Sequence, residues 1–250
     1  MSRPVAKASP SHQLLRVDGI PAPVEVRSHP TARRLTLRVS RTRRAVYLTV
    51  PQSFDVREAN RFLARSLDWV IARLDGVPEA VPFQNGAVLP VRGVMHQVQF
   101  AGPSKGRRAI VTILERPRES PLLSVSGPIE NAPRRLKDWL QAQAKRDLDA
   151  SVTHHAKNLG LRARKLTLRD QKSRWGSCSS DGHLSFSWRL VLAPPFVLDY
   201  VAAHEVAHLA EMNHGARFWR LVAKSCPKLE EAKFWLRGNG MDLYRYGVEE

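Results

Sequence analysis

The residues best suited to catalysis lie close together near position 205. His204, Glu205 and His208 form an HExxH motif within an apolar stretch that has the spacing of an α-helix. Residues four apart on a helix lie on one face, so both imidazoles can reach a single metal ion. The glutamate between them lies beside that ion, where its carboxylate can deprotonate a bound water. The motif therefore predicts a hydrolytic zinc site.

A catalytic zinc ion needs a third protein ligand and an open position. Asp199 precedes the histidine pair by more than a helical turn, and Glu211 lies too far along the axis unless the helix bends. Asn213 and Gly215 can end the helix in a left-handed conformation that brings His214 back to the metal. The predicted site is one Zn²⁺ per chain bound by His204, His208 and His214, with Glu205 as the catalytic base.

Other residues that could do chemistry lie outside this motif. Cys178 and Cys226 do not indicate a disulfide framework, and a nucleophilic Cys178 remains an alternative, although no partner histidine is dictated by the sequence. His154 and His155 are adjacent near the end of a predicted helix. Neighbouring side chains on a helix point in different directions, so we do not expect this pair to chelate a metal.

Periodicity predicts the elements that hold the motif. The helix of the motif is expected to begin at Pro194-Pro195, where a missing N–H costs little. A long helix from Pro133 to about Leu159, a strand, a hairpin closed by Asp181-Gly182 and two short helices surround it. The strand, the hairpin and the short helices are expected at Lys165–Arg169, Arg174–Ser179 with His183–Leu190, Arg217–Lys224 and Leu229–Leu236.

The first half of the chain is richer in strand patterns. One helix is expected there, capped by Ser53 or Asp55 and running to about Leu74. The predicted strands lie within Leu14–Val26, Arg34–Ser40, Ala45–Val50, Ala87–Val91, Val94–Phe100, Ala109–Leu114 and Leu122–Val125. We expect an α+β fold with a disordered tail over residues 1–12, a β-rich, mainly antiparallel portion over 13–130 and a helical portion over 131–250. The last two portions could also form one continuous domain, 13–250.

Several stretches resemble one known family, the YgjP-like metallopeptidase domain, which is similar to the SprT-like and minigluzincin zinc peptidases. They are Arg174–Ser179, Gly182–Leu184, Trp188–Leu190, the HExxH motif and Asn213–Trp219. The match is specific from about Leu166 to Trp219 and looser over the strands near Arg33–Val39 and Val46–Pro51. The resemblance implies a zincin-like C-terminal portion, zinc bound by the three histidines and Glu205 as the base.

The same resemblance places the hairpin beside the metal helix, where its edge could hold an extended peptide by strand addition. Trp175, Ser177 and Arg189 are therefore candidates for the substrate cleft. An acyl-transfer site also needs a group that stabilises the oxyanion. Tyr200 and Arg189 are the candidates for that role, and the sequence does not separate them.

The charge of the chain leaves the substrate open. Its 250 residues carry a formal net charge of +17, which favours acidic partners. A peptide or protein substrate is the first expectation. The alternatives are hydrolysis of nucleotide phosphoanhydrides, or a DNA-associated protease or nucleic-acid-binding protein that uses the basic hairpin Arg33–Arg44. The chain shows neither a signal peptide nor a membrane span, so we expect a cytoplasmic protein with no membrane partner.

Overall fold

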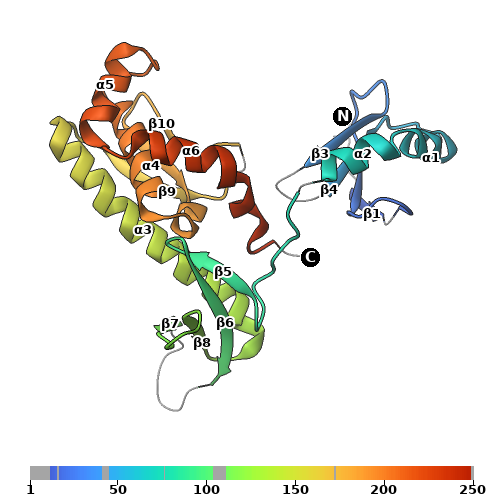
Figure 1. Cartoon of the computed structure of the whole chain (residues 1–250). Helices are drawn as coiled ribbons and strands as arrows, with labels where there is room; N and C mark the ends of the chain where they lie inside the picture. The colour runs from blue at the N-terminus through green and yellow to red at the C-terminus, as the bar shows by residue number, and fades with distance from the viewer. Residues whose placement is uncertain are drawn as a thin grey trace, which may run out of the picture. The chain divides into compact units, whose positions relative to one another are not determined.

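The computed structural model describes residues 12–15, 17–40, 45–75, 77–103, 111–171 and 173–248. The fold is mixed α+β, with six α-helices and three small sheets in the described residues. The chain divides into two compact units, Met1–Ala80 and Val81–Glu250 (Figure 1). The boundary expected near residue 130 falls inside the second unit, because Leu123 and Val125 share one core with Leu136 and Leu140.

The first unit contains a sheet with strand order β1-β2-β4-β3. Its strands are β1 (His12–Leu15), β2 (Val24–Ser28), β3 (Thr36–Ser40) and β4 (Ala45–Val50). The pairs β1/β2 and β3/β4 are antiparallel as predicted, whereas β2 and β4 run parallel. The predicted tail lies outside the described residues except for His12, and so does the turn 41–44.

The helix predicted to run to Leu74 is two helices, α1 (Val56–Arg65) and α2 (Leu67–Leu74). Asp55 caps α1 as expected, because its carboxylate accepts a hydrogen bond of 2.9 Å from the backbone N–H of Arg57. Ser66, with φ −97° and ψ 3°, interrupts the helix. Its conformation lets both helices bury apolar side chains in the core that also contains Val46 and Leu48 of the sheet.

The second unit holds two more sheets. The first, with order β5-β6-β8-β7, is built from β5 (Val88–Val91), β6 (Val94–Gly102), β7 (Val111–Leu114) and β8 (Leu122–Ser126). The second, with order β10-β11-β9, contains β9 (Lys165–Arg169), β10 (Gly176–Cys178) and β11 (His183–Ser187). Each includes one parallel pair, β6/β8 and β9/β11, so the sheets are mixed and less purely antiparallel than expected.

Four helices complete the second unit: α3 (Ala132–Leu159), α4 (Pro195–Ala207), α5 (Ala216–Ser225) and α6 (Leu229–Asn239). Helix α3 ends at Leu159 as predicted, and Gly160 follows it with φ 66°. Three short 3-10 helices, η1 (Ile129–Asn131), η2 (Trp188–Leu192) and η3 (Gly240–Arg245), connect the elements. The strand predicted to reach Leu190 ends at Ser187, because the Ser187 hydroxyl accepts a hydrogen bond from the N–H of Arg189 and starts η2.

Most of the buried residues of α4 belong to one hydrophobic core, which also contains Leu148, Leu184 and Phe218. Buried residues occur around its whole circumference, including Val197, Ala202, Ala203 and Val206. Such a helix is held by packing on all sides and presents few residues to solvent. It therefore forms a rigid support for the side chains at its C-terminal end.

Candidate metal centre

Three histidine side chains converge at the end of α4. His204, His208 and His214 each offer one ring nitrogen, and these nitrogens all lie within 4.8 Å of one another. The Nε2 atoms of His204 and His214 are 3.0 Å apart. Two nitrogens that bind one zinc ion tetrahedrally at 2.0–2.1 Å are roughly 3.3 Å apart. The three side chains therefore have the spacing of a tridentate metal site.

The chain brings His214 to the pair by a different turn from the predicted one. Helix α4 ends at Ala207, with His208 as its C-cap, and the chain turns at once over residues 208–210. Gly215 has φ −80° and Asn213 has no positive φ, so neither takes the expected left-handed conformation. The helix stops earlier than predicted, which leaves a loop long enough for His214 to return before α5 begins.

Hydrogen bonding and burial favour neutral imidazoles here. The Nδ1 atom of His208 lies 3.0 Å from the carbonyl oxygen of Glu211, and a carbonyl can only accept, so Nδ1 carries the proton and Nε2 keeps its lone pair. Burial and the two neighbouring histidines lower the pKa of His204 to about 4. Burial also lowers the pKa of His208. The buried Nδ1 of His204 has no hydrogen-bond partner among the described residues.

Glu205 lies beside this cluster and is 5% exposed. Burial raises the pKa of its carboxyl to about 7, against the opposing effect of the Arg174 charge. The carboxyl packs on Gly176 so closely that a Cβ atom there would lie 2.5 Å from Oε1 of Glu205. Gly176 is not among the predicted site residues, although a glycine inside a strand is a signal of close approach by another group.

The other predicted cleft residues differ in their surroundings. Tyr200 lies edge-on to His204, with ring centroids 5.9 Å apart, and burial raises its pKa to about 12. Its phenol therefore stays protonated and can donate a hydrogen bond at neutral pH. Ser177 is in β10 opposite Ser185, and Trp175 stacks on Tyr244 at 5.0 Å.

Arg189 is buried and hydrogen-bonded within the protein. Its side chain is 4% exposed and its Nε donates to Asp170 at 2.9 Å. Its Nη1 donates to the carbonyl oxygens of Leu243 and Tyr246, at 3.1 and 2.5 Å. Arg189 thus fixes the C-terminal segment, and these contacts disfavour the predicted cleft or oxyanion role.

Two further sequence hypotheses can be compared with the structure. Burial and the nearby Glu205 raise the pKa of Cys178 to about 11, so a thiolate nucleophile is disfavoured there. On the basic hairpin, Arg33, Arg34 and Arg38 are exposed, and Arg41–Arg44 lie outside the described residues. Nucleic-acid binding by this hairpin stays a prediction.

Three clustered imidazoles beside a buried carboxylate are the constituents of a metal-dependent hydrolase. The chain belongs to the YgjP-like family, whose metallopeptidase domain matches residues 33–239. Membership implies a metallopeptidase-type hydrolase with a metal cofactor.

Other comparisons add little. No curated protein matches the chain. A crystal structure of the metallopeptidase zymogen of Pyrococcus abyssi abylysin is similar at 20% identity, with 36% of this chain and 93% of that chain covered and a TM-score of 0.32. In the described part of the chain, no helix has the length and apolar content required to cross a bilayer.

Proposed function

We propose that this protein is a zinc-dependent peptidase in which His204, His208 and His214 bind the metal and Glu205 is the catalytic base. The observation that supports this most strongly is the convergence of three ring nitrogens, all within 4.8 Å of one another, next to a buried carboxyl group. Family membership gives the reaction class, and the residues give the assignment of roles.

The donor set suits zinc. Neutral imidazole is a preferred zinc ligand, and the low pKa values of His204 and His208 keep both rings neutral at pH 7 without a metal. Three histidine ligands leave one position open. A zinc ion bound there supplies a Lewis acid for the water and the scissile carbonyl.

Glu205 carries the proton transfer. With a pKa of about 7, its carboxylate can accept a proton from the attacking water and return it to the leaving amine. The backbone of Gly176 packs closely against this carboxyl and limits its movement. Tyr200, which keeps its phenolic proton, is the remaining candidate to donate a hydrogen bond to the oxyanion.

The substrate is proposed to bind along β10. This strand is at the edge of its sheet, so its outer backbone groups can pair with an extended peptide. A peptide paired there passes Gly176, whose Cα lies against Glu205. Strand addition at β10 therefore brings a peptide bond to the base.

The test compares the native chain with Glu205→Gln and with Glu211→Gln, a matched change that keeps the Glu211 carbonyl. Metal content is measured by mass spectrometry, and hydrolysis is measured on an unfolded-protein mixture and on nucleoside triphosphates. We expect about one zinc per chain in all three proteins. Glu205→Gln should lose about 10²- to 10⁴-fold in turnover of the protein mixture, and Glu211→Gln should keep it.

Each other outcome has a definite meaning. Turnover of nucleotides alone would replace the peptidase by a phosphoanhydride hydrolase on the same site. Full activity in Glu205→Gln would remove the assigned base. A chain that takes up no zinc on titration would contradict the metal site itself.

A further inference from the structure

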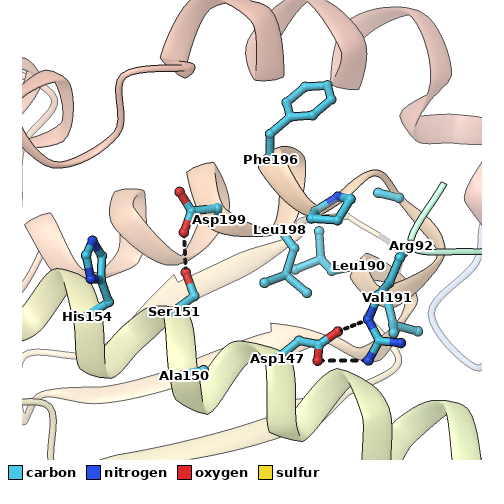
Figure 2. A pocket seen from close by; sticks show the side chains of 12 residues that line it. Arg92, Asp147, Ala150, Ser151, His154, Leu190, Val191, Phe196, Leu198 and Asp199 are labelled. Atoms are coloured by element: carbon cyan, nitrogen blue, oxygen red, sulfur yellow. Dashed lines mark hydrogen bonds and ion pairs between the residues drawn. The ribbon is translucent and has the colours of Figure 1, made fainter.

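A groove separate from the histidine cluster lies between α3, α4 and η2. Its volume is about 590 Å³, within the range of roughly 300–1,000 Å³ that small-ligand sites occupy. Its apolar lining comes from η2 and the first turns of α4: Leu190, Val191, Ala193, Pro195, Phe196 and Leu198. Figure 2 shows Leu190, Val191 and Leu198 on the side of α4 that faces Asp147 and Ser151 of α3, whereas the ring of Phe196 points away from α3. We refer to it as the α3–α4 groove.

The groove and the metal centre use different faces of α4. Asp199 faces the groove, and His204 follows five residues later, which corresponds to a rotation of about 140° around the helix axis. The groove-lining residues include neither Glu205 nor any of the three predicted metal ligands. A ligand in the groove would therefore not compete for the metal.

The polar rim of the groove contains one cation that is already neutralised. Arg92 donates from Nε and Nη2 to the two carboxylate oxygens of Asp147, at 2.7 and 2.9 Å, and from Nη2 to Gln143 at 3.1 Å. This bidentate pairing, visible in Figure 2, uses the planar fork of the guanidinium. Arg92 and Asp147 thus offer no net charge to a ligand.

Asp199 supplies the net negative charge. Its Oδ1 accepts hydrogen bonds from Ser151 at 2.7 Å and from His155 at 2.9 Å. Although burial acts in the opposite direction, these two hydrogen bonds lower the pKa of Asp199, so it is ionised at neutral pH. Figure 2 shows its second oxygen directed away from Ser151. The two bonds fix the carboxylate, so a ligand need not order it on binding.

We propose that the α3–α4 groove binds a polypeptide segment in which a lysine or arginine adjoins a bulky apolar residue. The apolar side chain would lie on Leu198 and on the apolar residues of η2, and the cation would pair with the outward oxygen of Asp199. An acidic ligand is less suited to this end of the groove, because Arg92 is already paired with Asp147 and Lys228 lies over the Phe196 ring, 5.3 Å from its centre. The assignment does not depend on the metal centre and extends the proposed function by a second binding site.

The test is calorimetric titration of the full-length chain, without added metal, with a short peptide that carries a Lys-Phe pair between glycine and serine residues. A second peptide replaces the lysine by norleucine. Ala150 lines the groove and is exposed on α3, so Ala150→Arg puts a competing cation beside Asp199 without removing a buried group. Ala142→Arg is the matched variant, because Ala142 is also exposed on α3 but lies outside the groove.

We expect the native chain to bind the lysine peptide with a Kd of about 100 µM or tighter. Norleucine and Ala150→Arg should each weaken binding by about tenfold or more, whereas Ala142→Arg should stay within about twofold of native. Thermal unfolding checks that both variants are folded. Ala150→Trp fills the groove with an uncharged side chain and should also weaken peptide binding. Equal binding of the two peptides, equal binding by Ala150→Arg, or no heat of binding by the native chain would each overturn the proposal. None of these results bears on zinc or hydrolysis.

Discussion

Two groups of histidines, one at and beyond the end of α4 and one on α3, differ in the hydrogen bonding of their ring nitrogens. His204, His208 and His214 point their ring nitrogens at one another, and one buried nitrogen of His204 has no partner among the described residues. His155 is completely buried, yet both of its nitrogens are used. They lie 2.5 Å from Ser225 Oγ and 2.9 Å from Asp199 Oδ1.

The difference supports the proposal that available lone pairs, and not histidine content, mark the predicted metal site. In the first group the Nε2 atoms of His204 and His214 face each other beside the apolar ring of Phe218, which is unfavourable until a cation is shared. In the second group both ring nitrogens of His155 have partners within the protein, and His154 is exposed. His155 therefore ties α3 to α4 and α5 and has no capacity left for a metal.

The carboxyl groups of α4 differ in the same way. Burial raises the pKa of Glu205, whereas at Asp199 burial is outweighed by two hydrogen bonds together with the charges of His155 and His154, and the pKa falls. A carboxylate without donors exchanges its proton near neutral pH, and one with donors stays charged. The first suits a catalytic base, and the second suits an ion pair.

The largest expected effect comes from removing one predicted metal ligand. His208→Gln should abolish stoichiometric zinc binding, since two imidazoles are rarely sufficient for a structural or catalytic zinc site. His154→Gln should keep about one zinc per chain. Mass spectrometry of the intact proteins under native conditions measures the zinc content of both variants. Equal zinc in the two variants would contradict the distinction between the histidine groups.

The next effect concerns the position of the base. In Gly176→Ala the new Cβ would lie 2.5 Å from Oε1 and 2.8 Å from Cδ of Glu205, so the carboxyl must move. We expect zinc to be retained and turnover to fall by about a hundredfold. Gly238→Ala is the reference, because nothing lies within 4 Å of a Cβ there and the backbone is helical. If both variants were fully active, close packing at Gly176 would have no role in catalysis.

The sequence alone could predict the clustered histidines, but it could not predict the contacts between distant segments that hold the site in place. The spacing of His204 and His208 follows from helix geometry, and the long helix α3 follows from the periodicity of its buried leucines. The contact of Gly176 with Glu205 depends on how β10 packs on α4, and Arg189 depends on where the C-terminal segment runs. These are contacts between distant segments, which local patterns do not encode. The parallel pairing of β9 with β11 was missed for the same reason.

A smaller effect is expected on stability in the metal-free chain. The pKa of Glu205 rises from 4.5 to about 7 on folding, so its contribution is complete below pH 4.5 and is lost as the pH rises through 7. The pKa of His204 falls from 6.5 to about 4, so its contribution is present above pH 6.5 and is lost as the pH falls through 4. The two trends oppose each other between these limits.

Comparison with Glu205→Gln isolates the glutamate. Urea unfolding with a chelator present should show the variant gaining up to about 3 kcal/mol in unfolding free energy relative to the native chain, between about pH 4.5 and pH 8. The gain should be small once zinc is bound, since the cation stabilises the ionised carboxylate. A constant difference across this pH range would mean that Glu205 is ionised in the folded chain at all of these pH values.

The smallest effect should separate His155 from His154. His155→Phe leaves Ser225 and Asp199 without their partner in the core and should lower the free energy of unfolding by about 1–3 kcal/mol. His155→Gln, which can restore one hydrogen bond, should lose less, and the exposed His154→Phe should stay within about 0.5 kcal/mol of native. Zinc content should be unchanged in all three variants. A loss of zinc in His155→Phe without a loss of stability would show that the buried histidine acts on the metal centre through α4, and the two histidine groups would then be coupled.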